Sequence, residues 1–292
     1  MIRRHSVISP HAQQGAAALI MLIILVLGAS YLFVSELNRS SLQTERNKIT
    51  AAALAQAKEA LIGYAAADSN RPGELPCPDV TNDGNSLPVE DYDGSNCKNL
   101  VGRLPWSTLR LPDLRDGYGE HLWYALSNDF HANGSATLNS GKNGALTVVG
   151  SYSANGVVAI IFAPGPALGT QPRDVPNENN LANYLEGKNA SAGSTFEAAN
   201  PSDMFNDKLL PITHNDLFSI VTRRIASEFA AQLTHPYPSS IPTTSLPWFE
   251  SNWKGVTVYE WVTSDKATIR FDGYNLLCTI TWKGDKSVSQ CH

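Results

Sequence analysis

The feature that most constrains this chain is an apolar run near its start, over residues 16–34, that contains no charged side chain. The run is just long enough to cross a bilayer as a helix, and it is longer than the apolar core of a typical secretory signal. Arg3 and Arg4 precede it, which predicts a helix with its N-terminus in the cytoplasm. We therefore expect a transmembrane segment over residues 16–34.

The helical pattern continues beyond the apolar run to residue 67 without a proline. Apolar residues recur at four- and seven-residue steps among charged ones. These apolar positions are Leu42, Ile49, Ala53, Ala57 and Leu61. One helix over residues 16–67 is predicted, with a length of about 78 Å at 1.5 Å per residue. Its last part is amphipathic, as expected for a helix end that packs on a globular domain.

The remaining residues, 68–292, predict an α+β globular head with an antiparallel β-sheet. The predicted strands cover residues 145–150, 159–166, 256–262, 268–273 and 276–284. An amphipathic helix is predicted over residues 215–233, with Asn215 or Asp216 as its N-cap. Residues 171–207 are polar and rich in Asn, and they predict a long loop.

The charge distribution argues against binding to nucleic acid. The formal net charge is −5, whereas a surface that binds phosphates normally shows clustered Lys and Arg. The sequence also lacks the HExxH, GxSxG and phosphate-loop motifs. Ser107, Asp113 and His121 could be combined into a catalytic triad on paper, but any chain of this length offers such trios. We therefore predict no enzymatic activity and no nucleic-acid partner.

The four cysteines fall into two pairs that are close in sequence, Cys77 with Cys97 and Cys278 with Cys291. Behind a segment that suits export, this spacing predicts two local disulfides. Free buried thiols and a four-cysteine zinc site are the alternatives. A zinc site usually groups its ligands as CxxC pairs, and the sequence contains none.

The chain start combines a short basic leader, Gln13, Gln14 and Gly15, and an apolar helix that becomes amphipathic. This order resembles the N-terminus of type IV pilins and type II secretion pseudopilins. The resemblance implies a leader over residues 1–15, cleavage by a prepilin peptidase between Gly15 and Ala16, and methylation of Ala16. It also implies other pilin or pseudopilin subunits as partners and a single-pass position in a bacterial inner membrane. The head would then lie in the periplasm, or at the cell surface on a filament tip.

Two positions depart from the common pattern of that family. The first mature residue is usually Phe and the fifth is usually Glu, where this sequence has Ala16 and Ile20. Both departures resemble the K-type minor pseudopilins and the X-type minor pilins. In the family the glutamate is thought to pair with the N-terminal amine of a neighbour, and a tip subunit has no neighbour above it. Ile20 therefore suggests a tip or initiating subunit, although a plain membrane anchor also explains it.

A second resemblance covers residues 71–79 (RPGELPCPD), 102–109 (GRLPWSTL) and 116–127 (DGYGEHLWYALS). The block is similar to one that recurs in bacterial prepilin-like proteins, and it implies no particular activity. Its prolines predict turns and its aromatic residues predict core packing.

The segment between the first two cysteines has the spacing of a calcium-binding loop. Counted from Asp79, an acidic residue stands at position 5 (Asp83), a glycine at position 6 (Gly84) and a glutamate at position 12 (Glu90). Thr81 and Asn85 would supply further oxygen ligands, so the sequence predicts a calcium site. The alternative is an acidic loop of Asx turns closed by a disulfide.

Two classes of function remain. The first is a structural subunit, a minor pilin or pseudopilin that initiates or caps a type IV pilus-like or type II secretion filament. The second is a membrane-tethered or secreted extracytoplasmic domain, either a ligand-binding module or a hydrolase. Secretion would follow cleavage after Ser30, where Gly28 and Ser30 supply the small residues that a signal peptidase needs. The first residue of the mature chain distinguishes these hypotheses.

Overall fold

The structure is a computed structural model that describes residues 11–87, 90–94, 96–131, 137–169 and 171–292. By its internal contacts the chain divides into two compact units, Met1–Lys48 and Ile49–His292. Helix α1 (His11–Ala67) passes from the first unit into the second. Of the predicted leader, residues 1–10 lie outside the described residues, whereas Gly15 and Ala16 lie within α1.

Helix α1 was predicted to cross a membrane, and the structure does not support this prediction. It is 57 residues long, but no helix among the described residues is both long enough and apolar enough to cross a bilayer. The predicted transmembrane span over residues 16–34 is therefore contradicted. The single-pass position in an inner membrane, with a periplasmic head, is withdrawn with it.

The head is built from two main sheets, short helical turns and a second helix. The six-stranded sheet contains β3 (Val101–Arg103), β4 (Trp123–Leu126), β5 (Leu146–Gly150), β6 (Ala154–Ala163), β7 (Thr195–Ala198) and β8 (Lys208–Thr213). The four-stranded sheet contains β9 (Thr257–Thr263), β10 (Lys266–Phe271), β11 (Tyr274–Lys283) and β12 (Lys286–Cys291). The remaining elements are β1 (Tyr92–Asp93), β2 (Asn96–Cys97), η1 (Asn128–Phe130), η2 (Leu181–Asn183), η3 (Gly187–Ala190), η4 (Phe249–Trp253) and η5 (Lys254–Val256).

The six-stranded sheet is mixed, whereas the antiparallel sheet predicted from the C-terminal strands is the four-stranded one. Its strands follow the order β3-β4-β6-β5-β7, and β8 also pairs with β6. β7 runs parallel to β5, with Val148 opposite Phe196. A parallel pair needs a long connection, and residues 164–194 between β6 and β7 provide one. The predicted loop over residues 171–207 therefore contains a strand of the sheet.

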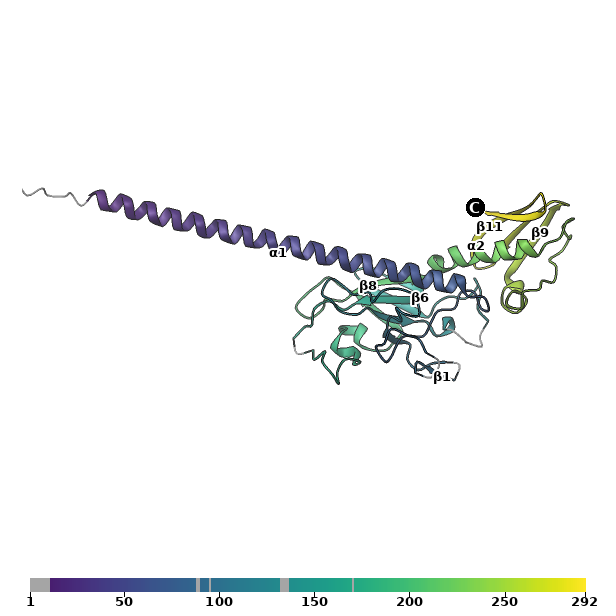
Figure 1. Ribbon diagram of the computed structural model, residues 1–292, viewed down its shortest axis with the longest axis horizontal. Coiled ribbons are helices and arrows are strands. Elements are labelled where there is room, and N and C mark those ends of the chain that lie inside the picture. The colour runs from purple at the N-terminus through teal and green to yellow at the C-terminus, as the bar shows by residue number, and fades with distance from the viewer. Residues whose placement is uncertain (1–10, 88–89, 95, 132–136, 170) are drawn as a thin grey trace, which may run out of the picture. The chain divides into compact units, whose positions relative to one another are not determined.

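The two faces of the six-stranded sheet belong to two hydrophobic cores, as the alternation of side chains along a strand requires. On β4, Tyr124 and Leu126 join the core that also contains α1 residues, whereas Trp123 and Ala125 join a second core on the opposite face. The second core is closed by Tyr184 and its neighbours from the long connection. Figure 1 shows β6 and β8 beside the C-terminal part of α1.

Helix α2 (His214–Gln232) begins with a capping box. The Thr213 side chain accepts a hydrogen bond from the Asp216 N–H, and the Asp216 carboxylate accepts one from the Thr213 N–H at 2.8 Å. The N-cap is therefore Thr213 and not Asn215 or Asp216, because Asp216 occupies the third helical position of the box. α2 contacts β6 and β8 of one sheet and β11 and β12 of the other. It is the element that the two sheets share.

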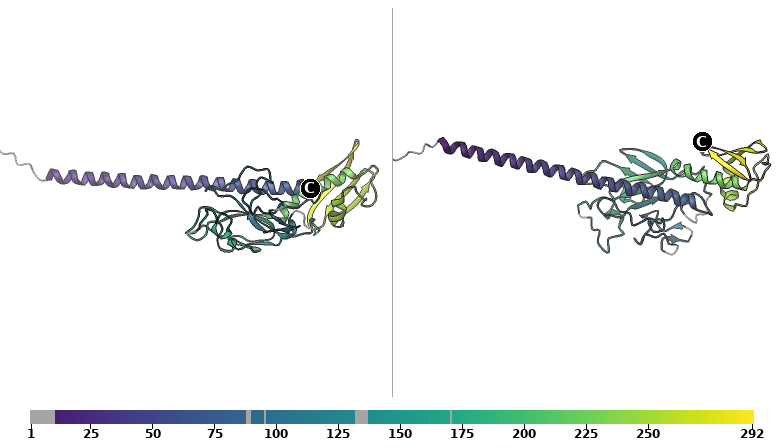
Figure 2. Two further views of the ribbon diagram at one scale, coloured as in Figure 1. Left: turned by 60° about the horizontal axis from the view of Figure 1, so that its bottom comes forward. Right: turned by 45° about the horizontal axis from the view of Figure 1, so that its top comes forward.

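The four-stranded sheet is antiparallel throughout, in the order β12-β11-β10-β9. Figures 1 and 2 show this sheet next to α2. Its inner face contributes Ile269, Phe271 and Ile280 to the core that α2 also enters. Cys278 and Cys291 are direct partners across β11 and β12 and form one of the two predicted disulfides.

Candidate functional site

The first candidate is the surface of α1 in the first unit. Every side chain from Ile20 to Leu27 is large and apolar, and each is between 48 and 73% exposed. Because successive residues of a helix point in all directions, this surface is apolar on every side. A helix that is apolar all round is normally buried, for example in the core of a large protein. This part of α1 therefore has the character of a contact surface.

The second half of α1 is fixed to the head by a buried stripe of small and apolar side chains. The stripe consists of Ala53, Leu54, Ala57, Leu61 and Ala65. Lys58 adds an ion pair with Asp216 of α2 at 2.8 Å and a hydrogen bond to the Pro211 carbonyl at 3.0 Å. Burial alone would raise the pKa of Asp216, but hydrogen bonds from Lys58 and Thr213 bring it below its ordinary value.

The end of α1 is closed by an arginine from α2. Arg224 donates hydrogen bonds to the carbonyl oxygens of Ala66 and Asp68. A cation at this position also suits the partial negative charge at the C-terminus of a helix. α1 and α2 are therefore joined at two places, at Lys58 and at Arg224.

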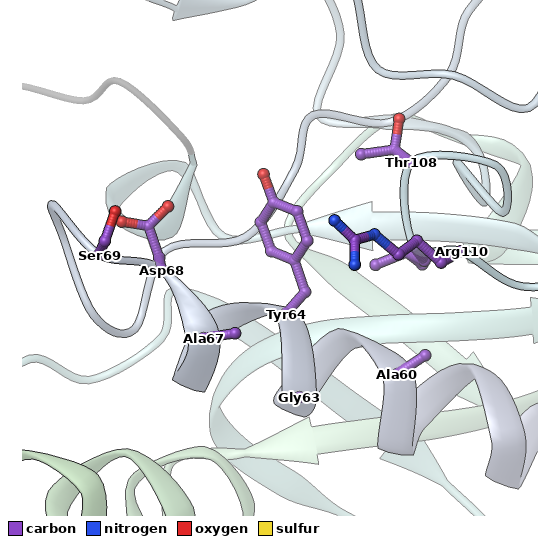
Figure 3. Close-up of a pocket in the computed structure, with 9 residues that line it drawn as sticks. Ala60, Gly63, Tyr64, Ala67, Asp68, Ser69, Thr108 and Arg110 are labelled. Carbon is purple, nitrogen blue, oxygen red and sulfur yellow. The ribbon is translucent and has the colours of Figure 1, made fainter.

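A pocket of about 520 Å³ lies beside this last part of α1. One wall is the helix, with Ala60, Gly63, Tyr64 and Ala67, and it continues into Asp68 and Ser69. The other wall is the turn from Thr108 to Arg110. In Figure 3 the guanidinium group of Arg110 points toward the Tyr64 ring, and Asp68 lies on the far side of that ring. The pocket thus has a cationic and an anionic end.

The loop predicted to bind calcium is closed by the second disulfide, Cys77 to Cys97. Within it the Asp79 carboxylate accepts hydrogen bonds from the backbone N–H groups of Thr81, Asn82 and Gly84, at 2.7 to 2.8 Å. This is the Asx-turn arrangement that the sequence offered as the alternative. A buried carboxylate in this arrangement holds the turn together through its own oxygens.

Of the other predicted calcium ligands, Thr81 donates its hydroxyl to Asp79 Oδ1 at 3.2 Å. Asp83 accepts from the Asn85 N–H at 2.8 Å, and Glu90 is exposed. Within the described residues, no three His, Cys, Asp or Glu side chains form a group that could hold a metal ion. Calcium binding by Asp79, Thr81, Asp83, Asn85 and Glu90 stays a prediction from their spacing in the sequence.

Asp91, which follows the last position of the calcium pattern, is a second carboxylate that accepts backbone hydrogen bonds within the loop. Asp91 accepts from the N–H groups of Val80 at 2.9 Å and Leu87 at 2.7 Å. Burial raises the pKa of Asp91, while these two hydrogen bonds act in the opposite direction. Asp79 and Asp91 together organise the loop from inside.

Of Ser107, Asp113 and His121, the three residues considered as a catalytic triad, Asp113 and His121 are in contact. The Nε2 atom of His121 lies 3.3 Å from Asp113 Oδ1, and its Nδ1 atom lies 2.7 Å from Asn82 Oδ1. Burial lowers the pKa of His121, and the Asp113 charge opposes this shift. Ser107 makes no hydrogen bond to His121 or Asp113 within the described residues; its N–H donates to the Gly84 carbonyl at 2.7 Å. Among the described residues there is no positive sign of a catalytic function.

A cluster of buried polar side chains in the connection between β6 and β8 was not anticipated from the sequence. Asp207, only 4% exposed, accepts from the Glu186 N–H at 2.9 Å and from Asn189 Nδ2 at 3.0 Å. The Glu186 carboxylate in turn accepts from Gln171 Nε2 and from the Asn206 N–H, each at 3.0 Å. Burial and the neighbouring Glu186 raise the pKa of Asp207 to about 8. Both bonds are to Oδ2; the Oδ1 atom accepts no hydrogen bond from a described residue, and the protonated carboxyl group can donate to the Glu186 side chain beside it.

Comparisons of the chain with protein-family models, with curated proteins and with solved structures gave no match. The function is therefore inferred from the residues and their arrangement alone.

Proposed function

We propose that this chain is a structural subunit of a filament of the type IV pilus or type II secretion kind, and that it initiates or caps that filament. The observation that carries the proposal is the exposed apolar surface of α1 from Ile20 to Leu27. Exposed apolar area is unfavourable in water and marks a contact surface. Equivalent helices of other pilin or pseudopilin subunits can cover it, since helices pack side chains into each other's grooves.

Two sequence features support the terminal position in such a filament. Ile20 stands where the family usually has a glutamate that pairs with a neighbouring subunit. A subunit without this charge is suited to a place where no such neighbour exists. The head is also large, since it includes all of residues 68–292. The proposed role is structural, with no catalytic step.

Maturation of the chain is part of the proposal. A prepilin peptidase would cleave between Gly15 and Ala16, so that α1 starts at a new amino group. Mass spectrometry of protein from cells that contain the peptidase should give Ala16, with or without a methyl group, as the first residue. Gly15→Leu should block this cleavage. A chain that begins at Tyr31 or at Met1 would contradict this route.

Assembly through α1 is tested by site-specific photo-cross-linking. Benzoylphenylalanine placed at Met21, which is 73% exposed on α1, should cross-link the chain to other subunits in cells. Met204 is the matched control, because it is a methionine that is 84% exposed on the head. Cross-links at both positions in equal yield, or at neither, would refute assembly through α1.

A further inference from the structure

Arg110 has the one unusual backbone conformation in the described chain that residue type does not explain. Asn82 and Arg110 are the non-glycine residues with positive φ in this part of the chain, at 65° and 58°. Asparagine enters the left-handed region readily, because its short polar side chain bonds locally. Arginine has no such advantage. An arginine kept there at an energetic cost suggests a use for its side chain.

The turn that carries Arg110 is fixed by its own hydrogen bonds. The N–H of Arg110 donates to Ser107 O at 2.9 Å, and the N–H of Leu111 donates to Trp106 O at 2.8 Å. Leu109, between them, is buried in the core. Because the residues on both sides are held, the left-handed conformation sets the direction in which the Arg110 side chain leaves the turn.

That direction leads into the pocket beside α1. Figure 3 shows the guanidinium group facing the Tyr64 ring across the pocket. The Arg110 side chain is exposed, and no hydrogen bond or ion pair joins it to another described residue. On the opposite wall, Ala60, Gly63 and Ala67 have little or no side chain, so an incoming polypeptide can approach the helix closely. The pocket therefore offers a cation and open space together.

We propose that this pocket binds an acidic segment of a partner protein, whose carboxylate pairs with Arg110. A guanidinium group presents its N–H donors in the geometry that a carboxylate accepts. The far end of the pocket favours a carboxylate over a phosphate. Asp68 lies there, and its carboxylate accepts hydrogen bonds from the N–H groups of Asn70 and Arg71. Its negative charge repels a doubly charged phosphate more strongly than a singly charged carboxylate. The site stands independently of filament assembly.

The proposal is tested with two capped peptides, Ala-Ala-Glu-Ala-Ala and Ala-Ala-Gln-Ala-Ala, added to the full chain in a non-ionic detergent. The side-chain Nε–H resonance of Arg110, assigned by its loss in Arg110→Gly, should shift with the glutamate peptide only. Arg110→Gly should weaken binding by roughly tenfold or more, the effect of losing one charge-assisted pair. Glycine suits the left-handed conformation, so the variant should stay folded.

Arg270→Ala is the matched control, since it removes an exposed arginine from another part of the head. It should bind the glutamate peptide as the wild type does. Equal binding of both peptides, unchanged binding by Arg110→Gly, or no binding at millimolar peptide would each overturn the proposal. A stronger response to inorganic phosphate than to the glutamate peptide would also reject a carboxylate as the ligand.

Discussion

Replacing Asp207 by asparagine should remove a pH dependence from the stability of the head. In the folded chain the Asp207 carboxyl group is buried beside Glu186, and its pKa is raised from its ordinary value of 3.8 to about 8. The unfolded chain releases this proton near its ordinary pKa, whereas the folded chain keeps it. Stability therefore falls as the pH rises between these two values, and it levels off above about pH 8.

The size of the effect follows from the number of protons involved. One proton retained by the folded state changes the free energy of unfolding by about 1.4 kcal/mol per pH unit. Between about pH 5 and about pH 7 the wild type should lose roughly 3 kcal/mol from this source. In Asp207→Asn the amide copies the protonated carboxyl group, since it donates to Glu186 and accepts from the Glu186 N–H. The free energy of unfolding of Asp207→Asn should therefore fall less steeply with pH than that of the wild type.

The assay is urea unfolding, followed by tryptophan fluorescence, at a series of pH values across this window. Asp203→Asn is the control, because it removes one carboxylate from an exposed position of the same segment. The wild type and Asp203→Asn should show the same slope against pH, and Asp207→Asn a flatter one. Parallel curves for all three proteins would refute a shared proton between Asp207 and Glu186.

Three further substitutions test the local structure by thermal or urea unfolding. Replacing Cys77 and Cys97 together by alanine opens a loop of sequence separation 20 and should cost about 3 kcal/mol; no change would mean that the disulfide does not restrict the unfolded chain. Asp79→Ala leaves backbone N–H groups without their acceptor and should cost roughly 2–4 kcal/mol, whereas a neutral result would contradict its role in the loop. Arg110→Gly should equal the wild type or exceed it by up to about 1 kcal/mol, and a large loss would show that the left-handed conformation is not strained.

The parts of the fold that follow from local patterns were predictable from the sequence. The helix expected over residues 215–233 is α2, and the strands expected near the C-terminus are β9, β10 and β11. Both disulfides join cysteines that are close in sequence. The capping box was also visible in the sequence, because Thr213 is followed three residues later by Asp216. The predicted cap, Asn215 or Asp216, was wrong because both residues lie within the first turn of α2.

The parts that depend on long connections were not predictable in the same way. The pairing of β7 with β5 brings together Val148 and Phe196, and no periodicity within either strand encodes a partner that far along the chain. The contact between Glu186 and Asp207 likewise joins residues that no local sequence pattern connects. An acidic, glycine-containing loop suits both metal binding and Asx turns, so the spacing of its residues alone does not distinguish the two uses.

The placement of α2 between the two sheets has a mechanical consequence. The four-stranded sheet shares its core with α2, and α2 is attached to α1 through Lys58 and through Arg224. A pulling force applied to the C-terminal sheet would therefore pass along α2 and reach α1 at these two attachments. The ion pair and the arginine hydrogen bonds would carry tension side by side with the apolar core that α1 and α2 share, so that rupture requires all of them to break.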